Sequence, residues 1–271
     1  MSLVDSLRAD AAAVLKDGRA KLVVGYRKRG DRCVPVLLAN AEKVDVLVVD
    51  ADCKQNLAAY LRKPEVRWYK PLAIVARPAV MRSLVVLQAE SQLAEGDLVV
   101  LGVGEGETYH GILDLKGVAA LLKEKYADLA PDPTVLVRVK ELAAMSAEDR
   151  AAFWQEQFAK CTRCYACRAA CPMCYCQRCI VEKNTPQWIS TAAREHGNYA
   201  WNVIRAFHLA GRCTACGACE AACPQGIPLS LLSAKVAGDV ADEFGAKAGY
   251  DPEAKPVIGS FNVDDKEDFI R

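Results

Sequence analysis

The chain has 271 residues, of which 52% are hydrophobic and 25% charged, so it can bury a sizeable core and is not intrinsically disordered. Its 35 lysines and arginines against 34 acidic residues argue against a nucleic-acid-binding protein, which needs a basic surplus on one face. No run approaches the roughly 18 apolar residues of a membrane span, and residues 1–10 lack a signal-peptide core. We expect a cytoplasmic protein without a membrane span, while peripheral membrane association stays open.

The first 130 residues alternate short apolar runs with helical patterns. Five runs rich in valine, leucine and isoleucine predict β-strands, at 21–26, 34–38, 44–49, 72–76 and 97–102. Helical patterns occur at 2–16, 53–62, 80–93 and 118–126. Strands that alternate with helices indicate an α/β domain with a mostly parallel sheet, which we place at residues 1–130.

Prolines mark the end of this domain. Pro131 and Pro133 do not suit a helix interior, so we expect a linker over 131–146. Ser146, three residues before an aspartate, predicts the start of a helix over 147–160. This helix opens a mainly α-helical domain at 147–250, and the acidic, proline-containing residues 251–271 are expected to form an extended tail.

The chain contains 13 cysteines, an odd number that argues against a disulfide framework in a chain without a signal peptide. Eleven of them fall between Cys161 and Cys223, which leaves only Cys33 and Cys53 in the first domain. This distribution favours metal binding in the second domain.

The pattern Cys-x2-Cys-x2-Cys-x3-Cys-Pro occurs twice, starting at Cys161 and at Cys213. Bacterial ferredoxins bind [4Fe–4S] clusters with this spacing, whereas structural zinc sites need no third cysteine at the next step. In two-cluster proteins the fourth cysteine of each motif usually binds the other cluster. The predicted ligands are Cys161, Cys164, Cys167 and Cys223 for cluster 1, and Cys213, Cys216, Cys219 and Cys171 for cluster 2. The 40 residues between the motifs favour a helical ferredoxin-like domain.

Five cysteines are left over. Cys174, Cys176 and Cys179 follow the first motif closely, and a third [4Fe–4S] cluster would need one more ligand. Cys53, expected at the amino terminus of a helix that would favour a thiolate, is the best candidate, and Cys33 then stays unused. The alternative is that these are buried cysteines that behave as small hydrophobic residues.

Other residues are candidates for supporting roles. Gly102, Gly104 and Gly106 follow a predicted strand, but they lack the full Gly-x-Gly-x-x-Gly spacing, so either FAD or no ligand is compatible with this turn. Three arginines flank cluster ligands: Arg163, Arg168 and Arg212. They would raise a cluster potential, be solvated, or pair with a partner protein. Three aromatic residues are expected to shield the clusters from water: Trp188, Trp201 and Phe207.

Residues 161–179, 205–213 and 222–229 resemble the dicluster iron–sulfur proteins grouped with beta subunits of deazaflavin-linked hydrogenases and formate dehydrogenases, which associate with heterodisulfide-reductase-like complexes. A weaker similarity runs through 44–50 and 53–61. The resemblance implies electron transfer inside a multi-subunit anaerobic oxidoreductase, with FAD in some members. The order of motifs differs from that of the flavin-bearing hydrogenase subunits, because here the cluster motifs follow the α/β domain.

Two functions are carried forward. In the first, the chain is an electron-transfer subunit of a hydrogenase, formate dehydrogenase or heterodisulfide-reductase-like complex, and relays single electrons through two or three [4Fe–4S] clusters. This agrees with the lack of a catalytic triad, paired carboxylates or a P-loop. In the alternative, the α/β domain binds a flavin, accepts hydride and feeds the clusters. A scaffold protein with structural clusters is a third interpretation.

Overall fold

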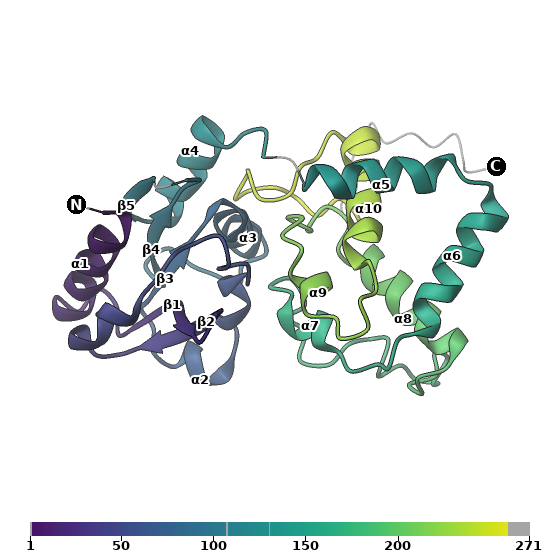
Figure 1. Cartoon of the computed structure of the whole chain (residues 1–271), viewed down its shortest axis with the longest axis horizontal. Helices are drawn as coiled ribbons and strands as arrows, with labels where there is room; N and C mark the ends of the chain where they lie inside the picture. Colours follow the sequence, from purple (N-terminus) through teal and green to yellow (C-terminus); the bar gives the residue numbers. More distant parts are fainter. Residues whose placement is uncertain (1, 107, 130, 260–271) are drawn as a thin grey trace.

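The computed structural model describes residues 2–106, 108–129 and 131–259. A region built on a β-sheet lies beside a region built of helices, and the chain passes from the first to the second after α4 (Figure 1). The prediction of an α/β region followed by a mainly helical one is therefore confirmed at this level. No helix in the described part of the chain is both long and apolar enough to cross a membrane.

The sheet has five strands in the order β2-β1-β3-β4-β5. They are β1 (Leu22–Arg29), β2 (Arg32–Leu38), β3 (Leu72–Ala76), β4 (Leu98–Val103) and β5 (Tyr109–Leu113). The three central strands β1, β3 and β4 run parallel, whereas β2 and β5 pair antiparallel at the two edges. The expected mostly parallel sheet is thus a mixed sheet, because each edge strand follows its neighbour through a short turn, which forces an antiparallel pair.

One strand prediction was wrong, and one strand had not been predicted. Residues 44–49 do not add a strand; the 3₁₀ helix η1 (Ala41–Val46) occupies this segment, and Leu47 then packs onto the bare face of Gly25 in β1. Strand β5 was missed because its residues are only half-buried and include a histidine and a glycine, so no apolar run marks it.

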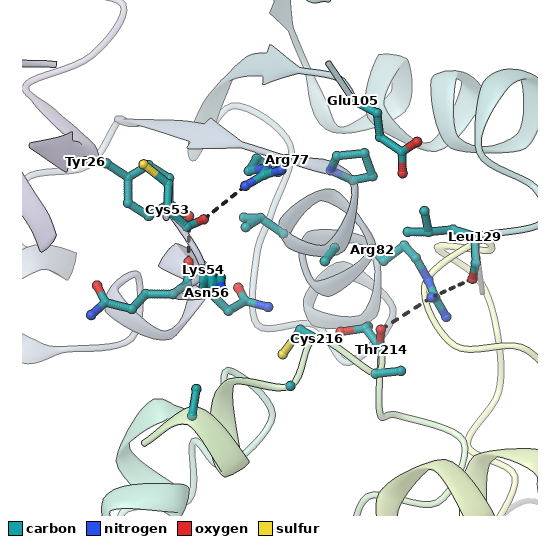
Figure 2. A pocket seen from close by; sticks show the side chains of 17 residues that line it. Tyr26, Cys53, Lys54, Asn56, Arg77, Arg82, Glu105, Leu129, Thr214 and Cys216 are labelled. Atoms are coloured by element: carbon teal, nitrogen blue, oxygen red, sulfur yellow. Dashed lines mark hydrogen bonds between the residues drawn. The ribbon is translucent and has the colours of Figure 1, made fainter. Parts of the chain in front are cut away.

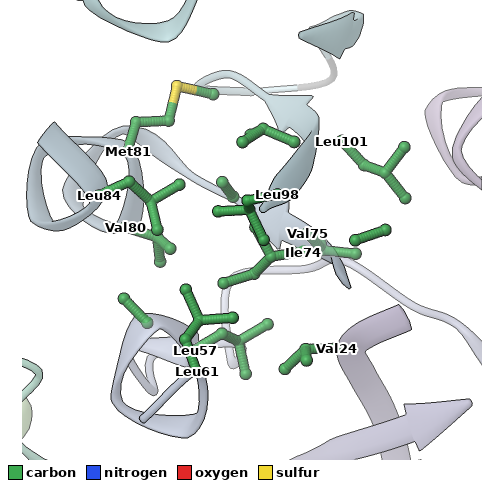
Figure 3. Packing of buried hydrophobic residues seen from close by; sticks show 14 of the residues in the cluster. Val24, Leu57, Leu61, Ile74, Val75, Val80, Met81, Leu84, Leu98 and Leu101 are labelled. Atoms are coloured by element: carbon green, nitrogen blue, oxygen red, sulfur yellow. The ribbon is translucent and has the colours of Figure 1, made fainter. Parts of the chain in front are cut away.

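Four α-helices and a second 3₁₀ helix complete this region: α1 (Leu3–Lys16), η2 (Leu57–Tyr60), α2 (Pro64–Arg67), α3 (Pro78–Ala89) and α4 (Leu115–Lys125). All five residues of β3 are buried, and so are nine of the twelve residues of α3. Figure 3 shows how side chains of α3, such as Met81 and Leu84, pack over the central strands. The helix predicted over 53–62 is reduced to η2, so Cys53 does not lie at a helix amino terminus.

The second region contains α5 (Pro133–Ala144), α6 (Ala147–Ala159), α7 (Ala166–Ala170), α8 (Glu195–Phe207), α9 (Ala218–Ala221) and α10 (Leu229–Phe244). The expected linker over 131–146 therefore contains a helix. Pro133 is the first residue of α5, where a missing N–H costs no hydrogen bond, and Asp132 caps the helix through the N–H of Thr134. The capping residue Ser146 of α6 is found as predicted.

Arg82 of α3 joins the two regions. Its guanidinium donates to the carbonyl of Ala248 at 2.8 Å and to that of Thr214 at 3.3 Å, and Ser83 Oγ lies 3.1 Å from Thr214 Oγ1. The Tyr250 hydroxyl donates to the Tyr126 carbonyl at 2.9 Å. Residues 248–250 therefore fold back over the sheet region. Of the expected tail, 251–259 contain no helix or strand, and 260–271 lie outside the described residues.

Replacing Gly249 with alanine is expected to destabilise the protein by about 2 kcal/mol, because a Cβ there would lie 2.6 Å from the Arg82 carbonyl oxygen and the residue has φ +84°. Gly238 in α10 is the control, since a Cβ there meets nothing within 4 Å and alanine favours a helix by roughly 0.5–1 kcal/mol. In urea denaturation of the cluster-loaded chain, we expect the midpoint to fall for Gly249→Ala and to rise for Gly238→Ala. Equal midpoints would mean that the 248–250 segment does not pack as described.

Candidate metal centre

The two cysteine motifs adopt the same backbone conformation. Arg163 and Tyr165 in the first motif have φ of 57° and 60°, and the equivalent Ala215 and Gly217 have φ of 54° and 70°. Left-handed residues at two alternate positions curl the chain so that successive N–H groups can turn toward one side, as in anion-binding loops. Three of these positions carry a side chain, which costs conformational energy that the fold must offset. The repeat is therefore one of shape as well as spacing.

All four predicted ligands of cluster 2 line a single cavity of about 420 Å³. Cys213, Cys216 and Cys219 come from the second motif, whereas Cys171 comes from the end of the first. Helices α7 and α9, which follow the two loops, contact each other and so bring Cys171 across. The four cysteines therefore share one cavity, and their assignment to cluster 2 stays a prediction.

The predicted ligands of cluster 1 lie around the second apolar core. Cys167 belongs to this core together with Phe158 and Trp201, and Cys161 and Cys223 pack against it. Cys164 is exposed. Cys223, from the second motif, therefore packs against the same apolar core as two cysteines of the first, and Cys219 of the second motif packs against this core too.

Buried thiols of the second motif are poor ligands until metal arrives. Burial raises the pKa of Cys213 to about 11 and that of Cys219 to about 12, so both would be protonated at neutral pH. Iron binds the thiolate, and each ligand must therefore lose a proton when a cluster is inserted. A positively charged iron core supplies the stabilisation that the apolar surroundings lack.

Arg205 of α8 lines the same cavity and is only 5% exposed. Its Nη2 donates to the Cys167 carbonyl at 3.2 Å, whereas its buried Nε has no hydrogen-bond partner among the described residues. Burial alone would lower the pKa of Arg205, but the surrounding cysteines, Cys174 and Cys219 first, raise it above its usual value. Arg205 is therefore a fixed cation with a free donor beside the cluster-2 ligands, and an anionic [4Fe–4S] cluster fits both properties.

Sequence reasoning missed Arg205. The signal is a stripe on α8 at spacings of three and four residues: Asn198, Trp201, Asn202 and Arg205, all buried. Asn198 Nδ2 donates to the carbonyls of Phe158 and Cys161, at 3.1 and 2.7 Å, so this face holds the cluster-1 loop. Polar residues on the inner face of a helix are uncommon and indicate a site that needs them.

The roles predicted for flanking residues hold only in part. Arg168 pairs with Glu182 at 2.9 Å and Arg212 pairs with Glu90, so both charges are offset by carboxylates. Of the three aromatic residues expected to shield the clusters, Trp201 is buried, whereas Trp188 and Phe207 are 80% and 58% exposed. Glu90 lies 122 residues before Arg212, so no local pattern could have indicated this ion pair.

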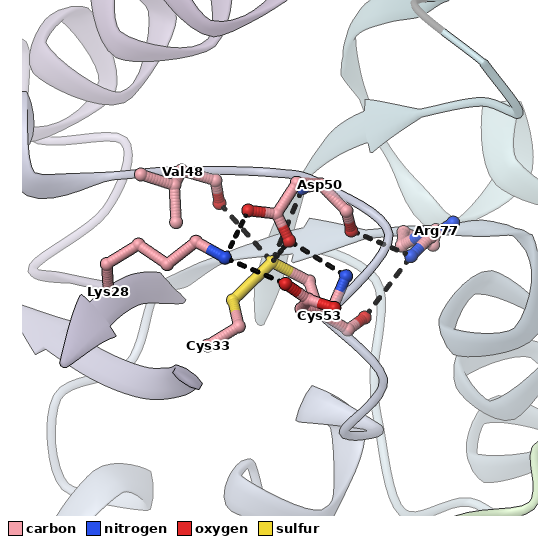
Figure 4. Close-up of polar contacts among 7 residues, drawn as sticks. Lys28, Cys33, Val48, Asp50, Cys53 and Arg77 are labelled. Atoms are coloured by element: carbon pink, nitrogen blue, oxygen red, sulfur yellow. Dashed lines mark hydrogen bonds and ion pairs between the residues drawn. A yellow bond between two sulfur atoms is a disulfide. The ribbon is translucent and has the colours of Figure 1, made fainter. Parts of the chain in front are cut away.

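Cys53 is not the free thiol that the third-cluster hypothesis needs. It forms a disulfide with Cys33, across a Cα–Cα distance of 5.2 Å (Figure 4). Cys33, which was expected to bind no cluster, lies in β2, and its sulfur is bonded to that of Cys53 in the loop after η1. This pairing depends on the tertiary structure: β2 pairs with β1, and the segment that leads to Cys53 lies beside β1, where the Val48 N–H donates to the Tyr26 carbonyl at 3.0 Å.

The other cysteines of that hypothesis have different surroundings. Cys174 hydrogen-bonds with Cys171, a predicted ligand of cluster 2, and packs against the core of the sheet region. Cys179 packs against the second apolar core, and Cys176 is exposed.

The glycines proposed for FAD have packing roles. A Cβ on Gly104 would lie 2.5 Å from the Tyr126 hydroxyl and 2.7 Å from His110 Nε2, and one on Gly102 would lie 3.0 Å from Leu113. The turn is therefore filled by the chain's own side chains, and no phosphate is needed to explain Gly102 and Gly104. Gly106, with φ +63°, only requires the freedom of glycine in a turn.

Comparison with known families identifies the helical region. Residues 156–227 match the family described as 4Fe-4S dicluster domain. This region is therefore similar to 4Fe-4S dicluster domains. The match covers both motifs, so the dicluster domain contains all eight predicted ligands, although it does not by itself assign each cysteine to a cluster.

Two relatives extend the comparison. The chain is 32% identical over 112 residues to the F420-dependent formate dehydrogenase subunit beta of Methanocaldococcus jannaschii, covering 41% of this chain and 28% of the relative. It is 30% identical over 106 residues to the F420-dependent formate dehydrogenase 1 subunit beta of Methanococcus maripaludis, covering 39% of this chain and 27% of the relative. The matched stretch thus spans less than a third of either relative.

Proposed function

We propose that the chain is an electron-transfer subunit of a formate-dehydrogenase-like oxidoreductase and relays single electrons through two [4Fe–4S] clusters. The dicluster domain supports this, as do relatives whose names describe subunits of formate dehydrogenases. The single observation that carries the proposal is the crossing of the two motifs, which places Cys171 among the cysteines of the second loop.

The crossing favours electron transfer over a purely structural role. A metal site that only stabilises a fold can be a single closed site. Two clusters bound by shared loops, in contrast, lie close enough to exchange electrons. Arg205 spans the two, since it lines the cluster-2 cavity and donates to the carbonyl of the cluster-1 ligand Cys167. When bound, each cluster supplies a one-electron couple; the protein supplies the thiolates, the fixed charge and the exclusion of water.

Reversible reduction is the test of this proposal. The loaded chain is reduced with a low-potential donor and then oxidised with a viologen, while the visible absorbance and the EPR spectrum are recorded. We expect two clusters that each take up one electron, with broadened EPR signals from magnetic coupling between them. Clusters that remain in one oxidation state throughout would favour the scaffold interpretation and contradict the proposal.

Iron analysis gives the number of clusters. Two clusters predict about 8 irons per chain, and a third predicts about 12. Because Cys53 is bonded to Cys33, we expect about 8, with an equal amount of acid-labile sulfide. A value near 12 irons per chain that falls to about 8 in a Cys176→Ala variant would support the third-cluster hypothesis.

A further inference from the structure

The Cys33–Cys53 disulfide lies where the sheet region faces the dicluster domain. Cys53 lines a cavity of about 380 Å³ together with Cys216 and Gly217 of the second cluster loop (Figure 2). Cys33 lines a neighbouring cavity of about 410 Å³, whose far wall consists of small residues of α7 and α9, such as Ala166 and Ala218. Both halves of the disulfide therefore face elements that hold the clusters.

The surroundings of the sulfur atoms suit thiol chemistry. The Asp50 N–H donates to Cys53 Sγ at 3.4 Å, and a carboxylate oxygen of Asp50 lies 3.5 Å from the same sulfur. Lys28 Nζ lies 2.7 Å from the other carboxylate oxygen of Asp50 and 3.1 Å from Asp52, as Figure 4 shows for Lys28 and Asp50. A proton acceptor, an N–H donor and a cation thus surround the atom that would carry charge after reduction.

The disulfide loop is also held in place. Arg77, the residue before α3, donates from Nη1 to the carbonyls of Asp50 and Cys53, at 3.2 and 3.3 Å. Cys33 and Cys53 are 7% and 2% exposed, so large protein thiols have little access to them. The pair is therefore little exposed, and the cavity that Cys53 lines is also lined by Cys216 of the second cluster loop.

We propose that Cys33 and Cys53 form a two-electron redox centre that is reduced by the cluster held in the Cys213–Cys219 loop. In the reaction the S–S bond breaks and two S–H bonds form, with uptake of two electrons and two protons. The electrons arrive one at a time through the clusters from a low-potential one-electron donor, and the protons come from water in the cavity, with Asp50 as the nearest carboxylate to Cys53. The proposal rests on the electron-transfer function proposed above.

An anaerobic titration with titanium(III) citrate tests it. The loaded wild-type chain should take up about four electrons, two into the clusters and two into the disulfide, whereas the Cys33→Ser, Cys53→Ser double variant should take up about two. Rapid alkylation and peptide mapping should find Cys33 and Cys53 modified only in the reduced wild type. The single variant Cys33→Ser, which removes the disulfide with one change, should behave like the double variant.

The outcomes separate the two proposals. If both chains take up about two electrons and show equal cluster bleaching, the redox centre is wrong and the electron-transfer function stands. If the clusters themselves are not reduced, both proposals fail. A Cys216→Ser variant, which lacks a cluster-2 ligand, should keep the disulfide oxidised with the same titrant; its full reduction there would overturn the electron route. One zinc per wild-type chain, lost in Cys33→Ser, would also overturn the proposal.

Discussion

Replacing Cys171 with alanine is expected to remove about half of the iron, from about 8 to about 4 atoms per chain. Cys171 is part of the first motif in sequence, but in the structure it lines the cavity of the second motif. Loss of its thiolate should therefore remove cluster 2 and leave cluster 1, whose predicted ligands lie around Phe158 and Trp201. Iron analysis and the disappearance of the coupled EPR signal measure the effect.

Cys174→Ala is the matched control. Its sulfur hydrogen-bonds with that of Cys171, so the two substitutions remove neighbouring thiols from the same place. We expect Cys174→Ala to keep about 8 irons, because Cys171 has the position before proline that the repeat assigns to a ligand, equivalent to Cys223. If Cys174→Ala loses the iron and Cys171→Ala keeps it, the ligand assignment is wrong.

Replacing Arg205 with glutamine is expected to lower the midpoint potential of cluster 2 while both clusters stay bound. Reduction adds a negative charge, and a buried cation stabilises the reduced form. For charges on the order of 10 Å apart at an effective dielectric constant of about 20, this stabilisation is about 1.7 kcal/mol. The hydrogen bond of Arg205 goes to the carbonyl of Cys167 and not to a carboxylate, so its positive charge can act on the cluster. A redox titration followed by EPR measures the shift.

Two further variants separate charge from packing and from hydrogen bonding. Arg205→Lys keeps the charge but not the planar group, and it should restore most of the potential if charge dominates. Arg178→Gln removes the same charge from an exposed position between Cys176 and Cys179, where water screens it. The midpoint potential of cluster 2 in this variant should therefore match that of the wild type. Equal shifts in Arg178→Gln and Arg205→Gln would show that net charge, and not the buried site, sets the potential.

The sheet illustrates where sequence patterns succeed and fail. Strands β1, β3 and β4 are central and buried, and their apolar runs predicted them within a few residues. Residues 44–49 form an equally apolar run, but Leu47 packs against Gly25 of β1. No local sequence pattern encodes this contact. The edge strand β5 escaped prediction for the opposite reason, because it is half-buried and has no continuous apolar run.

The candidate cluster ligands could be predicted from the sequence because the cysteine spacing is local. Three cysteines within seven residues, as from Cys161 to Cys167, are predicted to bind one cluster, and the cysteine before proline is predicted to bind the other. The partner of Cys53 and the position of Arg205 could not be read in this way. The partner of Cys53 depends on how β2 and the segment before Cys53 lie beside β1. The position of Arg205 depends on which face of α8 is buried.

The sequence by itself determined that this chain has two ferredoxin-type motifs behind an α/β region, since ligand spacing and apolar periodicity are properties of short segments. Only the tertiary structure decided which side chains surround those motifs. It placed Arg205 in the cavity that Cys171 and the second motif line, and the Cys33–Cys53 disulfide at the side of the sheet region that faces the second loop. These positions depend on contacts between segments far apart in the chain, which are fixed only when both regions pack together.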